Sequence, residues 1–281
     1  AFLKTRSMKG NDIVHAHNIP SALAMKKTSG KKILSLHGIY SQQITNLHGK
    51  IYSSISKNYE DRALKWADVI TAVSKETCNY YSKNGFDVLH VPNAIDLNNF
   101  PKKVIKKFEK QIIFAGRLSK EKGIDVLLDT AKRLPPEYNL LILGTGPEEK
   151  KVRNIANSKT NIHYLGYQSK QNTISLIRGS DLLIQPSIME GISSTLLEAM
   201  GCETCIIASN VGGNTEIIEN NKTGVLVEPN NAEELVAKIS YLLVENEKRS
   251  AMAANSFKTV VKYDWKQVGK LYLDIYESLL H

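Results

Sequence analysis

The strongest constraint on the fold is a series of short, almost uninterrupted apolar runs that are separated by longer amphipathic stretches. Strands of a parallel sheet are buried on both faces, so they read as continuous apolar runs instead of alternating with polar residues. The order of short apolar runs and helical patterns therefore predicts an α/β fold with parallel sheets. The clearest runs are Ile33-Leu34, Val69-Ile70, Leu140 to Leu143, Leu182 to Ile184 and Cys205 to Ile207.

The length of the chain predicts two domains. With 281 residues it exceeds the usual size of a single domain. Pro92 and Pro101 interrupt the apolar periodicity, and a basic segment follows them. We therefore expect an N-terminal domain at residues 1–100, a linker at 101–110 and a second domain at 111–263.

Two carboxylates, Glu190 and Glu198, flank a Gly-Ile-Ser-Ser turn that is expected to open a helix. Glu190 would lie on the loop before this helix, beside backbone N–H groups that can bind a phosphate, and Glu198 about one turn inside it. An anionic ligand with hydroxyl groups, such as a sugar nucleotide, would satisfy both carboxylates. An acidic first turn that only stabilises the helix through its dipole explains the spacing equally well.

Two cations, Arg117 and Lys122, lie on a predicted loop between a strand at Ile112-Ile113 and a helix. Such a pair can converge on a diphosphate, with Arg117 acting through its planar guanidinium and Lys122 as a mobile charge. A solvated basic loop accounts for either residue alone. The acidic element further along the same predicted sheet favours a binding site.

Several motifs, among them Gly116-Arg117-Leu118, Lys122-Gly123 and Glu190-Gly191, together resemble the group 1 (GT4) retaining glycosyltransferases of GT-B fold. They occur in the order of that family along nearly the whole chain, which makes the match more specific than any one motif. The resemblance implies an α/β protein with two Rossmann-like, doubly wound domains facing across a cleft, and a terminal helix at 264–281 that packs back on the first domain. The motifs are Asp12 to His17, Leu36-His37-Gly38, Ala67 to Ser74, Val91 to Asp96, Gly116-Arg117-Leu118, Lys122-Gly123, Leu143 to Pro147, Pro186-Ser187, Glu190-Gly191, Glu198-Ala199-Met200 and Val211-Gly212-Gly213 with Glu216.

The resemblance also implies a role for each candidate site residue. Arg117 and Lys122 would stabilise a departing diphosphate, Glu190 would hold the sugar, and Glu198 would bind the ribose. His37 would face the donor sugar as a fourth catalytic residue, although a hydrogen-bonded residue at a strand end is an alternative. Further substrate contacts are expected from Gly116, Gly144, Gly146, Tyr167, Gly191, Ile192, Ser193, Thr195 and Leu196.

The implied activity is retaining transfer of a hexosyl group from a UDP- or GDP-sugar to a glycan, lipid or small-molecule acceptor. It would need neither a metal nor another cofactor. A non-catalytic nucleotide-sugar-binding protein or fragment and a nucleotide-sugar epimerase of GT-B fold stay open as alternatives. A nicotinamide-dependent oxidoreductase is disfavoured, because no Gly-x-Gly-x-x-Gly opens a βαβ unit.

The N-terminal domain is expected to be incomplete. Relatives in this family carry an opening strand and a Gly-rich loop before the strand that contains His15 and His17, which begins here within a dozen residues of Ala1. We therefore expect a truncated chain that binds the donor but transfers sugar poorly or not at all.

Positive charge is concentrated in the first part of the chain. Residues 1–110 hold 18 Lys and Arg against 8 Asp and Glu, whereas residues 111–281 hold 19 against 20. The asymmetry suggests an anionic membrane surface or a lipid-phosphate acceptor, and a solvated lysine-rich surface explains it equally well. No nucleic-acid-binding pattern accompanies the lysines. Because no apolar run suits a membrane span or signal peptide, we expect a cytoplasmic protein that can lie at the inner face of the membrane.

The histidines and cysteines suggest other sites that we disfavour. His15 and His17 share one face of a predicted strand and could bind a metal with His37, but no carboxylate or cysteine accompanies them. Three cysteines argue against a disulfide framework. Cys202 and Cys205 form a Cys-x-x-Cys motif that follows a predicted helix instead of opening one, so we expect neither a redox nor a zinc site.

Overall fold

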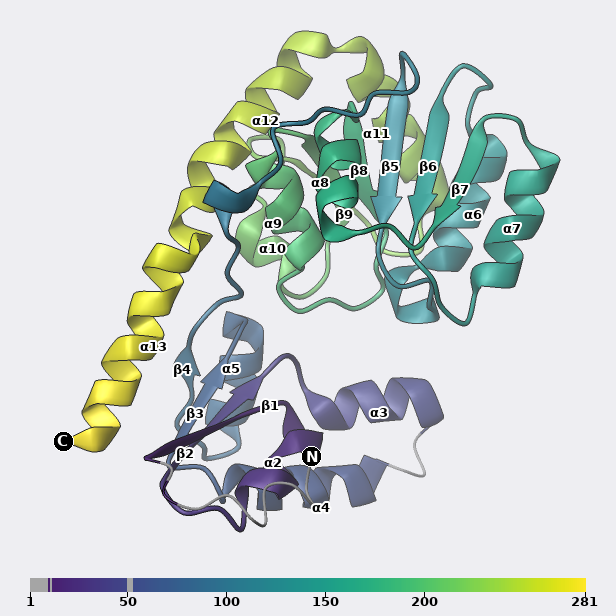
Figure 1. The fold of residues 1–281 in the computed structure, drawn as a ribbon. Coiled ribbons are helices and arrows are strands. Elements are labelled where there is room, and N and C mark those ends of the chain that lie inside the picture. The colour runs from purple at the N-terminus through teal and green to yellow at the C-terminus, as the bar shows by residue number, and fades with distance from the viewer. Residues whose placement is uncertain (1–9, 11, 50–52) are drawn as a thin grey trace. The chain divides into compact units, whose positions relative to one another are not determined.

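The computed structural model describes residues 10, 12–49 and 53–281, and these divide into two compact units. The first unit consists of Ala1–Asn93 together with Lys266–His281, and the second of Ala94–Trp265. The chain therefore leaves the first unit after Asn93 and returns to it at its C-terminal end. Figure 1 shows both units in ribbon form.

The first unit is built on a four-stranded parallel sheet with the order β1-β2-β3-β4. Parallel neighbours need crossover connections, and helices supply them here. A single apolar cluster that includes Leu34, Leu36, Ile70 and Tyr81 forms its core. The elements are β1 (Ile13–His17), α2 (Ile19–Met25), β2 (Lys31–Leu36), α3 (Tyr40–His48), α4 (Ser53–Leu64), β3 (Val69–Ala72), α5 (Lys75–Lys83), β4 (Leu89–His90) and the C-terminal helix α13 (Trp265–Leu280).

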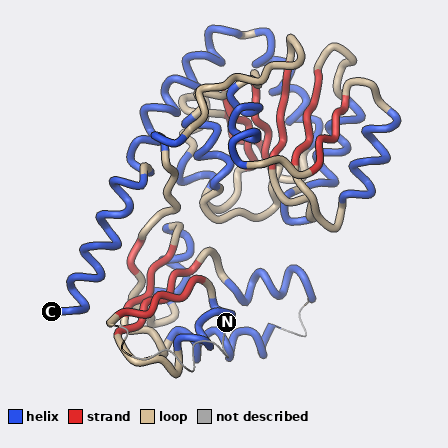
Figure 2. Tube along the Cα trace, viewed as in Figure 1, coloured by secondary structure: helices blue, strands red, loops and turns tan. Residues whose placement is uncertain are grey.

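The second unit is built on a six-stranded parallel sheet with the order β10-β9-β8-β5-β6-β7. The strand order reverses between β5 and β8, so this sheet is doubly wound. Figure 2 shows its strands between two layers of helices. The strands are β5 (Gln111–Ala115), β6 (Asn139–Leu143), β7 (Ile162–Gly166), β8 (Leu182–Gln185), β9 (Cys205–Ser209) and β10 (Val225–Val227).

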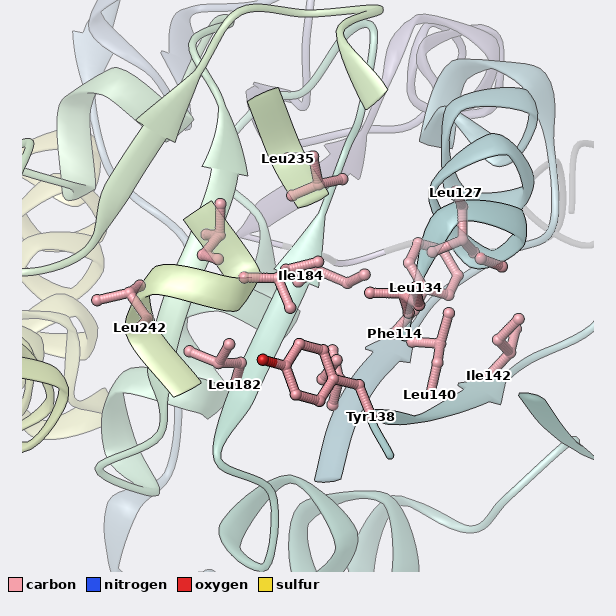
Figure 3. Close-up of a cluster of buried hydrophobic side chains, with 14 of the residues drawn as sticks. Phe114, Leu127, Leu134, Tyr138, Leu140, Ile142, Leu182, Ile184, Leu235 and Leu242 are labelled. Atoms are coloured by element: carbon pink, nitrogen blue, oxygen red, sulfur yellow. The ribbon is translucent and has the colours of Figure 1, made fainter. Parts of the chain in front are cut away.

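The strands of the second unit bury side chains on both faces, as continuous apolar runs predict. Ile112 and Phe114 join one apolar cluster, whereas Ile113 and Ala115 join another on the opposite face. Figure 3 shows the first cluster between β5, β6 and β8 and two of the covering helices. The helices of this unit are η2 (Leu97–Asn99), η3 (Lys120–Lys122), α6 (Ile124–Arg133), α7 (Glu149–Ser158), α8 (Lys170–Arg178), α9 (Ser194–Gly201), α10 (Asn214–Ile217), α11 (Ala232–Val244), α12 (Asn246–Val260) and η4 (Val261–Tyr263).

The segment 101–110, expected to be a linker, lies in the second unit. The Ile105 N–H donates to the Ser175 carbonyl at 2.9 Å, and the Lys106 ammonium lies 2.9 Å from the Asp181 carboxylate. A Cβ on Gly179 would lie 2.2 Å from the Ile105 carbonyl oxygen, so the segment lies directly against α8. These contacts are tertiary, which is why the break in apolar periodicity did not reveal them.

The C-terminal helix α13 belongs to the first unit, where it lies against polar side chains of β1 and β2. Val268 and Ile275 are its buried apolar residues. Tyr276 bonds to His15 at 2.8 Å, and Tyr272 lies 3.2 Å from the Ser35 hydroxyl. Among the described residues, no helix has the length and apolar character needed to cross a membrane.

Candidate functional site

The candidate site lies at the carboxyl ends of β5 and β8, where the strand order of the second unit reverses. Ligands of open α/β sheets bind at this kind of switch point. The loop after β5 leads through η3 into α6, and the loop after β8 leads into α9. The two motif regions that the sequence separates therefore follow neighbouring strands.

Lys122 and Glu190 form an ion pair that joins these loops. The Lys122 Nζ lies 2.7 Å from both Oε1 and Oε2 of Glu190. Gln185 Nε2 and the Ser187 hydroxyl donate to Oε2 of the same carboxylate, at 2.8 and 2.9 Å. Because the Glu190 side chain is only 9% exposed, these donors replace most of its contact with water. Lys122 and Glu190, two of the four predicted catalytic residues, are thus held together by this ion pair.

Backbone contacts fix the loops against each other. Gly123 adopts φ +68°, and a Cβ there would lie 1.8 Å from the Pro186 carbonyl oxygen. The Ile188 N–H also donates to the Glu121 carbonyl at 2.9 Å. Only glycine after the lysine allows the backbone of Pro186 to come this close, which explains the Lys-Gly pair of the motif.

Arg117 differs from Lys122 in being exposed. Within the part of the chain that the structure describes, its side chain has no hydrogen-bond or ion-pair partner. The guanidinium is consequently available to an anionic ligand at the same loop.

The loop after β8 leads directly into the first turn of α9. The Ser193 hydroxyl accepts from the Leu196 N–H at 3.4 Å and also bonds to the Gln185 side chain. Ile192 and Leu196 are buried in the apolar core, so only their backbone groups can meet a ligand. A Cβ on Gly213 would lie 2.3 Å from the Gly191 carbonyl oxygen, which packs the Gly-Gly motif against this turn.

A pocket of about 170 Å³ lies at the ends of β5, β6 and β7. Gly144 has φ +121°, and a Cβ there would lie 1.9 Å from the Gly116 carbonyl oxygen. A Cβ on Gly146 would lie 2.4 Å from the Leu118 carbonyl oxygen, so both glycines allow adjacent loops to touch. The lining residues are Ala115, Gly116, Leu143, Gly144, Tyr167, Gln168, Thr173 and Thr195.

The predicted contacts left out four of the lining residues, Ala115, Leu143, Gln168 and Thr173. Gln168 follows the predicted contact Tyr167, and its side chain donates to the Leu165 carbonyl at 2.7 Å and accepts from Asn172. Thr173 lies on α8 and reaches the pocket only through packing. A polar residue directly after Tyr167 was a usable signal for Gln168, whereas none marked Thr173.

Glu198 lies on α9 and is not among the residues that line this pocket. Burial raises the pKa of its carboxyl, and Lys170, whose Nζ lies 3.6 Å away, opposes that shift. Its carboxylate is thus held by one mobile cation.

His37 belongs to the first unit, at the end of β2, whereas the other predicted site residues belong to the second. Its Nε2 lies 3.4 Å from Nδ1 of His17. Loss of water contact lowers the pKa of His37, with a smaller contribution from His17. Among the described residues, no group of three or more His, Cys, Asp or Glu side chains is arranged to hold a metal ion.

Cys202 and Cys205 are both buried and free. Burial raises the pKa of each thiol to about 12. Both thiols are therefore protonated near neutral pH, a state that disfavours redox exchange and metal binding.

Comparison with known proteins identifies the family. A model of the glycosyl transferases group 1 matches residues 96–259, and a model of glycosyltransferase family 4 matches residues 3–99. The chain belongs to the group 1 glycosyl transferases. It is therefore an enzyme of the transferase type, and the family predicted from its motifs is confirmed.

Individual relatives of this glycosyltransferase cover most of its length. An uncharacterised glycosyltransferase of Methanocaldococcus jannaschii is 29% identical over 96% of this chain and 76% of its own. The phosphatidyl-myo-inositol mannosyltransferase of Mycolicibacterium smegmatis is 23% identical over 95% and 71%. The structure of Anabaena HepE in complex with UDP-glucose superposes with a TM-score of 0.81 at 19% identity, over 95% of this chain and 79% of that one. This likeness confirms the predicted GT-B type of fold, with two parallel-sheet α/β domains.

Proposed function

We propose that this glycosyltransferase takes a hexosyl group from a nucleoside-diphosphate sugar bound in the second unit and transfers it with retention. The observation that carries the proposal is the junction of the β5 and β8 loops. It places the Lys122–Glu190 pair on the same loops as the unpaired Arg117 and the start of α9. The structures of Anabaena HepE with UDP and with UDP-glucose support a donor of this class.

The diphosphate would bind to Arg117, Lys122 and the N-terminus of α9. These groups supply fixed positive charge where negative charge develops on the leaving group, a role that a metal fills in other transferases. The donor therefore has to draw Lys122 away from Glu190, or share it with that carboxylate. Once released, Glu190 can accept hydrogen bonds from sugar hydroxyls.

The nucleoside would occupy the pocket beside the diphosphate. Gly116 and Gly144 leave its floor without side chains, and Tyr167, with 78% of its surface exposed, can cover a planar base. Glu198 would bind the ribose hydroxyls. The acceptor would attack the face from which the diphosphate departs, with a diphosphate oxygen taking its proton.

The acceptor is proposed to be a glycan, a lipid or a small molecule, with an anionic group such as a lipid phosphate. The excess of Lys and Arg in residues 1–110 supports an anionic partner, as does the likeness to a phosphatidyl-myo-inositol mannosyltransferase. Four of these cations, Lys4, Arg6, Lys9 and Lys50, lie outside the described residues. Binding to vesicles with and without anionic lipid tests the membrane contact.

Calorimetry with UDP and GDP, with and without EDTA, tests the donor site directly. We expect one nucleotide to bind at one site per chain with unchanged affinity in EDTA. Product analysis by NMR with UDP-glucose, UDP-N-acetylglucosamine and GDP-mannose should show the α-anomer of the transferred sugar. An absolute requirement for Mg²⁺, or a product with inverted configuration, would contradict the proposal.

A further inference from the structure

The first unit contains a buried carboxylate that none of the roles above explains. Glu60 lies on α4 and is 0% exposed. Its Oε2 has no hydrogen-bond partner among the described residues, and the Lys57 ammonium lies 4.0 Å away from it. Burial of a carboxylate is unfavourable unless its contacts compensate. The position of those contacts therefore indicates what Glu60 does.

Within the described part of the chain, the side-chain hydrogen bonds of Glu60 lead to the start of α3, either directly or through Tyr81. Its Oε1 accepts from the backbone N–H of Ser41 at 3.2 Å and from the hydroxyl of Tyr81. Tyr81 lies on α5, is also 0% exposed, and its hydroxyl accepts from the Tyr40 N–H at 3.4 Å. Two buried side chains from two other helices thus accept the first N–H groups of α3.

Helix α3 has no local cap that could do the same. Its N-cap residue is Ile39, which makes no side-chain capping bond. The first N–H groups of a helix need acceptors, and a carboxylate there also complements the helix dipole. A local Ser or Asn cap would fix the loop only to its own helix, whereas Glu60 and Tyr81 fix it to α4 and α5.

The segment that is held in this way carries His37. It runs from the end of β2 through Gly38, at φ +148°, to Ile39 and the first turn of α3. Only two residues separate His37 from α3, so a shift of the helix start moves the histidine with it. Outside this segment the ring has a partner in His17, 3.4 Å away.

We propose that Glu60 and Tyr81 are positioning residues for glycosyl transfer, which act by holding the β2–α3 loop and thereby His37. The inference rests on the proposed function together with the catalytic role that the family resemblance implies for His37, which would face the donor sugar. Both residues belong to the first unit, whereas Arg117 and Lys122 belong to the second. Loss of either should consequently lower turnover and leave nucleotide affinity unchanged.

The test uses Glu60→Gln and Tyr81→Phe, with Thr28→Ala as a matched control. The glutamine of the first variant keeps the size of the side chain but removes the negative charge that complements the start of α3. The phenylalanine of the second keeps the ring while removing the hydroxyl, so both variants should fold. Thr28 is likewise buried in the first unit, but its hydroxyl bonds to the Met25 carbonyl at 2.7 Å, away from the loop. Measurements are the melting temperature, the Kd of UDP and of GDP, kcat with UDP-glucose or GDP-mannose, and NMR titration of isotope-labelled histidines.

We expect a roughly tenfold or greater fall in kcat for Glu60→Gln and Tyr81→Phe, with nucleotide Kd within about twofold of the unmodified chain. The His37 resonance should shift in both variants while those of His90 and His163 stay in place. Thr28→Ala should lower the melting temperature but keep kcat. The proposal would be overturned if kcat fell in proportion to the drop in melting temperature in all three variants. It would also be overturned if the His37 resonance did not shift in Glu60→Gln and Tyr81→Phe.

His37→Ala separates this inference from the proposed function. If His37→Ala loses transfer while Glu60→Gln and Tyr81→Phe keep full activity, the positioning role is wrong. The proposed function is then unaffected. Full transfer in His37→Ala removes His37 from the reaction and with it the positioning role. If the unmodified chain binds no nucleotide, the proposed function fails, and the His37 resonance alone then decides whether Glu60 holds the loop.

Discussion

Lys122 and Glu190 act as one unit, because each is the charged partner of the other. A diphosphate that binds Lys122 competes with a carboxylate already 2.7 Å from the ammonium. The affinity for nucleotide should therefore depend on the difference between the Lys122–diphosphate contact and the Lys122–Glu190 contact. Substitution of either residue changes the state of the one that is left.

Lys122→Ala should weaken UDP or GDP binding roughly ten- to a hundredfold. One charge-assisted contact contributes on the order of 1.5 to 3 kcal/mol, and the variant also leaves the Glu190 carboxylate beside an anionic ligand. Addition of Glu190→Gln to Lys122→Ala should recover part of the loss, because it removes that repulsion. Calorimetry on both variants checks this, and unchanged affinity in Lys122→Ala would count against it.

Substitutions of Glu198 and of Glu190 should have different effects on nucleotide affinity and on turnover. Glu198→Ala should weaken the intact donor and the free nucleotide alike, because a ribose contact exists in both. Glu190→Ala should preserve or improve nucleotide affinity, since it frees Lys122, and should reduce kcat, since its proposed contact is with the sugar. Titration with UDP or GDP, combined with turnover of the matching sugar nucleotide, checks the division. Equal losses of nucleotide affinity in both variants would show that the roles are wrongly assigned.

At the scale of residues, the sequence could predict which side chains belong to the candidate site. It could not predict which of them form an ion pair. The motifs indicated Lys122, Arg117 and Glu190 as site residues, and the structure places all three on adjacent loops. The ion pair could not be predicted, because spacing along the chain does not give the distance between loops of different strands. Thr173 was not predicted as a lining residue for the same reason, since only packing brings α8 to the pocket.

At the scale of elements, the site depends on how closely the β5 and β8 loops approach. Gly123 is a point of close approach, because a side chain there would meet the backbone of Pro186. The short apolar runs predicted the strands that these loops follow. The contact of residues 101–110 with α8 could not be predicted, because its hydrogen bonds join backbone groups that carry no sequence signal.

Gly123→Ala should lower both stability and nucleotide affinity. The left-handed backbone alone costs about 1–2 kcal/mol for a residue with Cβ, and displacement of the Pro186 carbonyl adds about 1–3 kcal/mol. Gly85→Ala is the matched control, because Gly85 has φ +84° with nothing within 4 Å of its Cβ position. Denaturant unfolding and UDP or GDP titration compare the two. A Gly123→Ala variant no less stable than Gly85→Ala would contradict the closeness of these loops.

The packing of α13 on β1 and β2 should make stability depend on pH. His15 bonds to Tyr276 and Ser35, and burial together with the neighbouring His17 and His37 lowers its pKa to about 4. Below its ordinary pKa of about 6.5 the unfolded chain binds a proton that the folded chain excludes. This contribution is therefore complete above pH 6.5 and is lost as the pH falls towards 4.

His15→Gln should flatten the pH dependence of unfolding between pH 6.5 and 4. Glutamine can keep one hydrogen bond to Ser35 or Tyr276 but does not titrate. The lowered pKa values of His37 and His163 act in the same direction and should leave a smaller slope in the variant. Urea unfolding monitored across this range measures both slopes, and identical slopes in the two proteins would rule out His15 as the main source.

At the scale of the whole molecule, the chain builds separate cores. The first unit has one apolar cluster, and the second has one on each face of its six-stranded sheet. The length of the chain predicted two domains, but the first unit of the structure ends at Asn93 and not at the predicted residue 100. Residues 94–110 belong to the second domain and Lys266–His281 to the first, so the chain crosses between the units twice.

Separate cores should unfold as two calorimetric transitions, of which nucleotide raises only one. A ligand at about 100 times its Kd stabilises the domain that binds it by ~2.7 kcal/mol, which for a domain of this size shifts Tm by about 5–10 °C. UDP or GDP should therefore raise the transition of the second unit, and Arg117→Ala should diminish that shift. Glu60→Gln should lower only the other transition, because Glu60 lies in the first core. Equal shifts of both transitions with nucleotide would mean that the donor site is shared between the units and is not confined to residues 94–265.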